Sequence, residues 1–412
     1  MPARAFVGVV LSLIVAFTAG CGGGDEGGGS RTINWYVFSE PGGAYDAAVA
    51  TCNKQAKGAY KIKYVRLPTD ANQQRELLVR RLAAEDSSID VIGMDVIWTA
   101  EFAQAKWIKP WTGANERAAT EGKLKGPLRS VEYKDQIWAI PFTSNTQLLW
   151  YRKDKVKTPP KTWDQMIDQA VKLKTSIEVQ GRQYEGLTVW VNSLIASAGG
   201  QIVDEDGNVK VDGTTKQAAE VIKRLADEAP PPGLTTNAED EARLGFESGR
   251  SAFQINYPFI YPSAAEVKDP KDFQKKIGWA RWPGVKEGTP SRPPLGGINL
   301  GVSAYSEKPD LAFRAARCLA QPKNQIVATE KGGLPPTTES LYDDKAIKKV
   351  YPFGDLIAES LEDAAPRPIN PAYSDISLAI QKTFHPETDI DPDGIQSKLE
   401  NRLDKAADGK IF

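Results

Sequence analysis

Residues 139–166 read AIPFTSNTQLLWYRKDKVKTPPKTWDQM, and the rest of the chain is best understood from this stretch. The pattern predicts a strand that stops at Pro141, a polar turn at residues 143–145 and a second apolar strand at residues 147–152. Thr162, with Gln165 three residues further on, has the pattern of a capping box and predicts that a helix begins there. A short polar turn between two apolar strands can carry a chain from one lobe to another. Asn145 would then place an amide at the crossing.

The sequence before this stretch alternates between two kinds of hydrophobic pattern. Strands are predicted at residues 32–39, 61–68 and 90–96, and amphipathic helices lie between them. Alternation of this kind predicts parallel strands with right-handed crossovers, and ligands of such sheets bind beyond the carboxyl ends of the strands. Asp95, at the end of the third strand, is therefore a candidate ligand-binding residue. The alternative is that it caps a helix.

The sequence after residue 166 predicts a second set of elements. Helices are expected within residues 185–200, 216–229 and 235–249, and strands at 251–257 and 277–284. Another strand, within residues 293–306, is expected to return toward the first lobe. The chain has 412 residues, which is more than one hydrophobic core usually organises, so two lobes are expected.

Composition limits the possible functions. The charged residues make up 25% of the chain and the net charge is −1, so no nucleic-acid partner is expected. With one His and three Cys, the chain has no metal-binding motif, and no metal or cofactor is expected. Ten Trp and thirteen Tyr would supply flat apolar faces of the kind that carbohydrate-binding clefts use.

The N-terminus has the features of an export signal. An apolar run at residues 5–17 is followed by Thr-Ala-Gly-Cys, which predicts a lipoprotein signal peptide over residues 1–21, with Cys21 as the acylated residue. Thr18 departs from this lipobox pattern, where Leu is usual, and a plain signal peptide is the alternative. Residues 22–31 would form a flexible Gly-rich tether. The predicted location is the outer face of the cytoplasmic membrane, held there by lipid.

The two other cysteines, Cys52 and Cys318, lie in segments with helical patterns. Because paired cysteines are common in exported proteins, we expect a disulfide between them. Two buried free thiols are the alternative.

The segment 139–166, the expected return strand and the Gly-Gly-Leu-Pro-Pro turn at 332–336 resemble the extracellular solute-binding proteins of ABC sugar importers, in the maltodextrin-binding branch. The resemblance extends from residue 32 to the end. It implies an α/β, two-lobed periplasmic-binding-protein-like fold with three hinge crossings. The first lobe would comprise residues 32–140 and 297–345, and the second 141–296 and 346–412. The implied role is that of a monomer that binds a sugar without catalysis and delivers it to membrane permease subunits.

Several phrases, among them VWVNSLIASAGG and DAAPRPINPAY, resemble the trehalose-binding lipoproteins of mycobacterial importers. This narrower resemblance implies that the ligand is trehalose or a related disaccharide. It also implies a set of ligand-binding residues, namely Asp95, Asn145, Glu239, Tyr257, Gly333, Leu334 and Arg367. Tyr257 stands where the mycobacterial relative has Trp.

Other functions fit parts of this pattern. The same fold could bind another oligosaccharide, a polyol or a glycerol-phosphate-type solute, since Arg367 suits a phosphate as well as a hydroxyl. An exported glycoside hydrolase, with Asp95 and Glu239 as its carboxylate pair, is the enzyme alternative.

Overall fold

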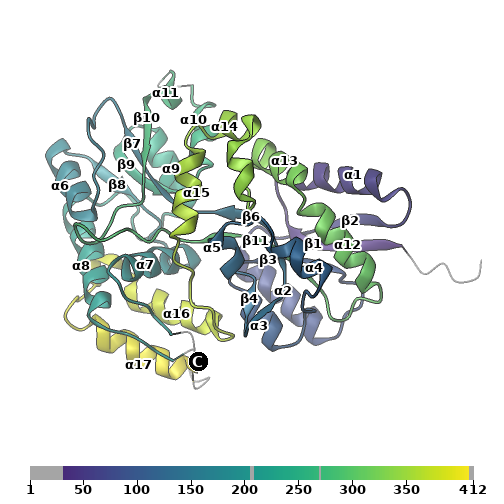
Figure 1. Cartoon of the computed structure of the whole chain (residues 1–412). Coiled ribbons are helices and arrows are strands. Elements are labelled where there is room, and N and C mark those ends of the chain that lie inside the picture. Colours follow the sequence, from purple (N-terminus) through teal and green to yellow (C-terminus); the bar gives the residue numbers. More distant parts are fainter. Residues whose placement is uncertain (1–30, 205–207, 269–270, 408–412) are drawn as a thin grey trace, which may run out of the picture.

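The computed structural model describes residues 31–204, 208–268 and 271–407. They form two α/β lobes, each built on its own sheet, which lie side by side in Figure 1. The first lobe holds a five-stranded sheet in the order β2-β1-β3-β11-β6, and the second lobe holds a four-stranded sheet in the order β10-β7-β9-β8. The two-lobed α/β fold predicted from the sequence is confirmed.

The elements up to the first crossing, together with those that return to the first lobe later, are β1 (Thr32–Phe38), α1 (Ala44–Ala56), β2 (Lys61–Leu67), α2 (Ala71–Ala83), β3 (Val91–Asp95), α3 (Thr99–Gln104), α4 (Ala114–Thr120), α5 (Lys125–Arg129), β4 (Glu132–Tyr133), β5 (Gln136–Ile137), β6 (Ile140–Asn145), β11 (Gly296–Val302), α12 (Pro309–Leu319) and α13 (Pro322–Gly332).

The remaining elements are β7 (Leu148–Arg152), α6 (Trp163–Leu173), β8 (Ser176–Glu178), α7 (Glu185–Ser197), α8 (Gly213–Glu228), α9 (Glu239–Glu247), β9 (Ser251–Asn256), α10 (Ile260–Ala264), α11 (Phe273–Lys276), β10 (Ile277–Ala280), the 3-10 helix η1 (Glu339–Asp343), α14 (Lys345–Val350), α15 (Gly354–Glu362), α16 (Tyr373–Phe384), the 3-10 helix η2 (Glu387–Asp389) and α17 (Ile395–Ala407).

The strand pairing of the first lobe follows the prediction. β1 pairs in parallel with both β2 and β3, so their carboxyl ends meet at one edge of the sheet. β11 is the return strand, and it runs antiparallel to β3 and β6. Its register places Ile298 opposite Asp95, and Gly296 opposite Asn145. The end of β3 and the end of β6 therefore lie on either side of the same strand.

The first crossing differs from the predicted strand and turn. Residues 143–145 are not a turn but the last part of β6, which runs through Pro141. Proline is tolerated here because β6 is an edge strand and its register against β11 shifts at Asn299, the partner of Pro141. Only Thr146 and Gln147 separate β6 from β7, and both are fully buried. The crossing is thus a short, covered link between two strands.

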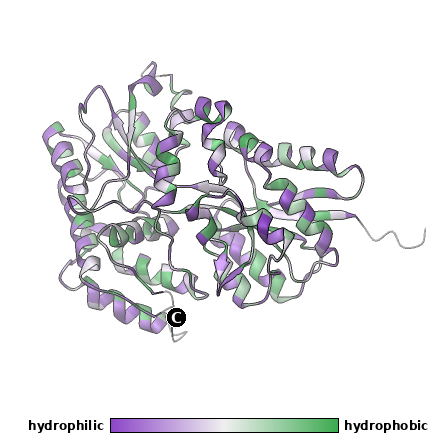
Figure 2. Cartoon of the chain, viewed as in Figure 1, coloured by the Kyte–Doolittle hydropathy of each residue, from purple (hydrophilic) through white to green (hydrophobic). Residues whose placement is uncertain are grey.

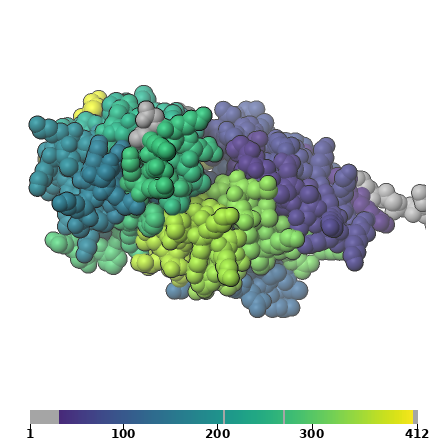
Figure 3. All heavy atoms as spheres, turned by 90° about the horizontal axis from the view of Figure 1, so that it is seen from above, coloured from purple at the N-terminus to yellow at the C-terminus, as the bar shows by residue number. Residues whose placement is uncertain are grey.

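Two further segments connect the lobes. Residues 281–295 lead from β10 back to β11, and residues 333–338 lead from α13 to η1. The second of these runs along β6, where the amide of Ser144 donates to the carbonyl of Pro335 (2.9 Å). All three connections therefore pass close to the end of β6. In Figure 3 the yellow-green part of the chain lies between the two lobes on the face shown.

Three clusters of buried apolar side chains hold the structure together. One packs helices such as α1 and α12 on the first sheet, and one packs α6, α7, α8, α16 and α17 against the second. The third joins Leu124 and Trp150 to side chains of η1, α14 and α15. The green, apolar sides of the helices accordingly face inward in Figure 2. Because the third cluster draws on segments from both sides of the first crossing, it stabilises the region of the crossings.

The predicted helix start at Thr162 is confirmed. Its hydroxyl accepts a hydrogen bond from the amide of Gln165 (3.2 Å), while the Gln165 side chain accepts one from the amide of Lys161 (2.9 Å). These two bonds satisfy amide donors at the start of α6 that have no partner within the helix.

A disulfide joins Cys52 on α1 to Cys318 on α12, with their Cα atoms 5.8 Å apart. The predicted pairing is therefore present in the structure, and it links two helices that are 266 residues apart in sequence.

In the ranges that the structure describes, no helix combines the length and the apolar character needed to cross a membrane. The predicted signal peptide, Cys21 and all but the last residue of the tether lie outside the described residues.

Glu387 on η2 gives the second lobe a pH-dependent stability. Its side chain is fully buried, and Nδ1 of His385 lies 3.7 Å from Oε1. Burial raises the pKa of Glu387 to about 8, whereas an unfolded chain has a Glu pKa of about 4.3. The folded state therefore binds more protons between these two values, and its stability falls as the pH rises through them.

We expect the free energy of unfolding of the wild type to fall by about 3–4 kcal/mol between pH 5 and pH 8 from this group. Glu387→Gln, which removes the titrating carboxyl and keeps its shape, is expected to remove that part of the fall. Urea unfolding at several pH values measures both. Parallel profiles for the two proteins would contradict the prediction.

Candidate functional site

A cavity of about 580 Å³ opens between the two lobes. Its lining comes from both sheets and from the crossing segments, and consists of Phe38, Thr69, Asp70, Ala71, Asn72, Asp95, Thr143, Ser144, Asn145, Arg182, Tyr184, Glu185, Gly186, Val189, Ala238, Glu239, Asp240, Glu241, Tyr257, Gly296, Gly297, Ile298, Leu334 and Arg367. We call this cavity the cleft.

The first lobe forms its side of the cleft from strand ends. Phe38 and Asp95 are the last residues of β1 and β3, and Asn145 is the last residue of β6. This is where the topology rule places a ligand, beyond the carboxyl ends of parallel strands. The carboxylate of Asp95 accepts a hydrogen bond from the amide of Ile97 (3.2 Å), which holds it at the end of its strand.

The second lobe contributes two helix starts and one strand end. Glu185 opens α7, Glu239 opens α9, and Tyr257 follows β9 directly. The fully buried Asn256 ties two of these together, because its amide group donates to the carbonyl of Glu239 (3.0 Å) and its oxygen accepts from the amide of Tyr257 (2.8 Å). The start of α9 and the end of β9 are therefore held together at the cleft.

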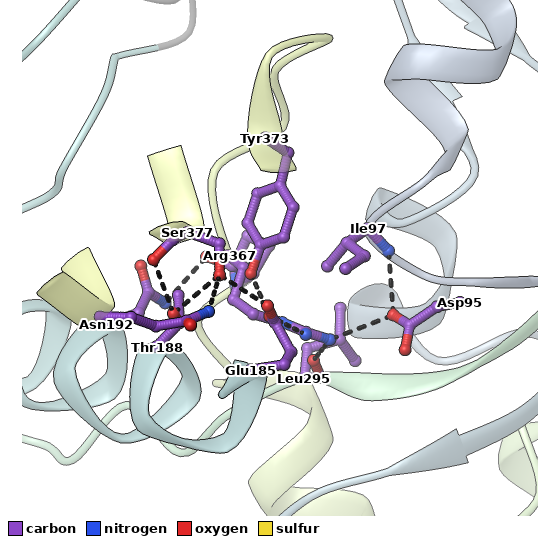
Figure 4. A network of polar contacts seen from close by, with 11 residues as sticks. Asp95, Ile97, Glu185, Thr188, Asn192, Leu295, Arg367, Tyr373 and Ser377 are labelled. Atoms are coloured by element: carbon purple, nitrogen blue, oxygen red, sulfur yellow. Dashed lines mark hydrogen bonds and ion pairs between the residues drawn. The ribbon is translucent and has the colours of Figure 1, made fainter. Parts of the chain in front are cut away.

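Arg367 lies between the lobes and joins them. Its side chain is 4% exposed, and Nη1 donates to Oε1 of Glu185 at 2.6 Å. Nη2 donates to Oδ1 of Asp95 at 3.3 Å and to the carbonyl of Leu295 at 3.4 Å. Figure 4 shows the guanidinium between Asp95 on one side and the α7 helix on the other. One arginine thus contacts a carboxylate from each lobe.

A second layer of side chains holds Glu185 in place. The hydroxyls of Tyr373 and Ser377, both on α16, donate to its two carboxylate oxygens, Ser377 at 2.7 Å. Ser377 in turn accepts from Gln381 (2.9 Å) and lies 2.8 Å from the hydroxyl of Thr188 (Figure 4). The orientation of Arg367 is therefore set from within the second lobe.

Burial also shapes the acid–base behaviour of the cleft. It raises the pKa of Glu239 above the ordinary carboxyl value. Burial, followed by the nearby Glu239 carboxylate, raises the pKa values of Tyr184 and Tyr257. Both phenols stay protonated at neutral pH, so their hydroxyls remain available as hydrogen-bond donors and acceptors.

The charge of the lining is predominantly negative. It contains six carboxylates, those of Asp70, Asp95, Glu185, Glu239, Asp240 and Glu241, and two guanidinium groups, those of Arg182 and Arg367. Such a surface offers many acceptors for hydroxyl groups, and it repels anionic solutes.

Six of the seven residues expected to bind ligand line the cleft, namely Asp95, Asn145, Glu239, Tyr257, Leu334 and Arg367. Gly333 is not part of the lining. It ends α13 with φ 61°, and its carbonyl accepts a hydrogen bond from the hydroxyl of Tyr351 (2.5 Å). Its contribution in this structure is the left-handed turn that presents Leu334.

Tyr184 and Glu185 line the cleft but were not predicted as ligand-binding residues from the sequence. The available signal was position, since both stand at the start of a helix in the second lobe, as Glu239 does. That signal alone does not distinguish a helix-capping acid from a cleft residue.

The chain has two α/β lobes that are joined by three segments and have a polar cleft with aromatic residues between them. This architecture is typical of a protein that encloses a small solute. Residues 38–326 match the family model of the bacterial extracellular solute-binding proteins, and the chain belongs to this family.

Relatives and solved structures agree with this assignment. A probable ABC transporter-binding protein of Deinococcus radiodurans is 30% identical over 327 residues, which is 74% of this chain and 76% of that protein. The maltose-bound MalE3 of T. maritima superposes with a TM-score of 0.80 at 25% identity, over 90% of this chain and 99% of that one.

The GacH receptor of Streptomyces glaucescens, whose structures include an acarbose complex, superposes with a TM-score of 0.78 over 92% of this chain and 98% of that one. At 22% identity it supports the fold alone. The family consists of binding proteins, so the prediction of a binding protein rather than a glycoside hydrolase is confirmed.

Proposed function

We propose that this protein is the substrate-binding component of an ABC sugar importer and that it captures trehalose or a closely related disaccharide. The observation that carries the proposal is the cleft itself, in which carboxylates, an amide, an arginine and a tyrosine from both lobes line one cavity of about 580 Å³. Its volume is within the range of pockets that enclose small ligands, roughly 300–1,000 Å³.

The chemistry of the lining suits a neutral disaccharide. Asp95, Glu239 and the amide of Asn145 accept hydrogen bonds from sugar hydroxyls, and charge-assisted bonds of this kind are the strong ones. Arg367 donates hydrogen bonds to the oxygens of the sugar. Tyr257 offers a ring to the C–H face of a pyranose. A solved neighbour at 25% identity supports this class of ligand, since it holds maltose.

The alternative solutes differ in charge and size. A glycerol-phosphate-type solute would bring negative charge into a lining where carboxylates outnumber cations, so it is disfavoured. Another disaccharide is the stronger alternative, because Tyr257 presents a smaller face than the Trp of the trehalose-binding relative, together with a hydroxyl.

The arrangement also supports a mechanism of delivery. A ligand that contacts Asp95 in one lobe and Glu239 in the other favours the conformation in which both lobes reach it, so binding shifts the population toward closure. The closed, monomeric protein would then dock on the permease subunits. A lipid on Cys21 and the Gly-rich tether would keep it close to them.

Calorimetric titration of residues 32–412 tests the proposal, with trehalose as the ligand and maltose and sucrose as comparisons. We expect saturable 1:1 binding of trehalose. Asp95→Ala is expected to weaken it about tenfold to a hundredfold, the range for a hydrogen bond to a charged group. Binding of maltose or sucrose without trehalose would reassign the solute, and the absence of binding to all three would overturn the sugar assignment.

A further inference from the structure

The guanidinium of Arg367 is unusual for a group that faces a ligand cavity, because its donors are largely occupied by the protein. Nη1 is bonded to Glu185, and Nη2 to Asp95 and to the carbonyl of Leu295. Nε is buried and has no hydrogen-bond partner among the residues that the structure describes. An arginine that binds phosphate tightly uses two parallel donors as a fork. In this structure both donors of that fork, Nη1 and Nη2, are already bonded to protein atoms.

The charges around Arg367 also disfavour an anionic ligand. Arg367 is always protonated, and two carboxylates, those of Glu185 and Asp95, lie against it. An anion that approached the guanidinium would meet both of them. A sugar hydroxyl, by contrast, carries no charge and needs only a single donor or acceptor.

Glu185 is the better placed of the two carboxylates to exert this effect. It makes the shorter contact, 2.6 Å against 3.3 Å, and its side chain is 15% exposed against 24% for Asp95. Tyr373 and Ser377 of α16 hold it in place, whereas Asp95 reaches Arg367 from the other lobe. Glu185 is therefore the carboxylate that contacts of the second lobe fix beside Arg367.

We propose that Glu185 is a specificity-determining residue of the cleft: it neutralises Arg367 and occupies Nη1, one of the two donors of its fork, so that the arginine serves neutral, hydroxyl-bearing sugars and rejects phosphorylated or otherwise anionic ones. This inference rests on the proposed function and adds to it the class of solute that the site excludes. It also explains how a buried arginine can line a sugar cleft without making that cleft a phosphate site.

Glu185→Gln tests the inference, because the amide oxygen can still accept from Arg367 while the negative charge is lost. Binding of trehalose, trehalose 6-phosphate and inorganic phosphate is measured by calorimetric titration at low and at physiological ionic strength. We expect the wild type to bind trehalose and neither anion. In the variant, binding of at least one anion is expected to become measurable, and its affinity relative to trehalose is expected to exceed the upper limit set by the wild type about tenfold or more. This gain is expected to shrink with added salt.

The controls separate this effect from a general disturbance. Glu387→Gln removes a buried carboxyl group from the same lobe but outside the cleft lining, so it is expected to leave the ratio of the affinities unchanged. If Glu185→Gln does not fold, Asp95→Asn removes the other carboxylate on the same guanidinium. Because Asp95 is also a proposed sugar ligand, the quantity measured in that variant is the affinity for the anions themselves, which is expected to rise.

The outcomes also distinguish this inference from the proposed function. A wild type that binds sugar, combined with an unchanged ratio in the variant, overturns the role of Glu185 and leaves sugar binding intact. A wild type that binds inorganic phosphate as tightly as trehalose overturns the exclusion of anions. A wild type that binds none of the sugars overturns the proposed function.

Discussion

Replacing Arg367 by alanine is expected to abolish measurable sugar binding and to lower the free energy of unfolding by about 3 kcal/mol. The guanidinium contacts a carboxylate from each lobe, Glu185 at 2.6 Å and Asp95 at 3.3 Å. Without it, two acidic groups face each other across the cleft. Glu185, which is mostly buried, would lose its partner, and leaving a buried charge unpaired is costly.

Binding and stability need separate measurements, by titration calorimetry and by urea unfolding. Arg367→Lys keeps the charge but replaces the planar fork by a point charge, so it is expected to retain most of the stability and little of the affinity. Arg224→Ala is a matched control, because Arg224 also pairs with several carboxylates, Asp164 and Asp168 among them, but these are exposed. It is expected to cost less than about 1 kcal/mol. Equal losses of unfolding free energy in Arg224→Ala and Arg367→Ala would contradict the special role of Arg367.

Much of this fold could be predicted from local patterns. The three strands of the first lobe, the return strand and the start of α6 each carry their own signal, whether β-branched runs, apolar periodicity or a capping residue. The rule for parallel sheets made Asp95 a candidate ligand-binding residue, with helix capping as the alternative, and Asp95 lies in the lining of the cleft. These features depend on residues close together in sequence.

The first crossing could not be predicted in the same way. Thr143, Ser144 and Asn145 have the composition of a turn, and Pro141 normally ends a strand. The structure keeps them in β6 because β11 and the Pro335–Pro336 segment, both distant in sequence, supply hydrogen-bond partners on either side. Tertiary pairing outweighs the local preference here.

The site, too, has residues that could be predicted from the sequence and residues whose roles depend on distant contacts. The residues predicted through the resemblance lie in the cleft, apart from Gly333, which shapes the turn before Leu334. Glu185 was missed because its role comes from partners on α16, nearly 190 residues further along the chain, and from the position of Arg367. The local sequence around an acidic residue at a helix start does not indicate such distant partners.

Removing the disulfide with Cys52→Ala and Cys318→Ala together is expected to lower the free energy of unfolding by about 3 kcal/mol or more. The bond closes a loop across 266 residues, which contains both crossings that enclose the second sheet. Loop closure of this size restricts the unfolded chain strongly, and the entropic model gives about 5 kcal/mol for it. The cysteines lie on α1 and α12, and neither lines the cleft.

The expected result is therefore a protein that unfolds at lower urea concentration but binds sugar with unchanged affinity in the native range. Reduction of the wild type with dithiothreitol provides the comparison, because it opens the loop without removing the sulfur atoms that pack beside Asn324. Agreement between the reduced wild type and the double variant would assign the loss to the broken cross-link and not to the missing sulfur atoms. A double variant within about 0.5 kcal/mol of the oxidised wild type would show that α1 and α12 are held together by their packing on the first sheet alone.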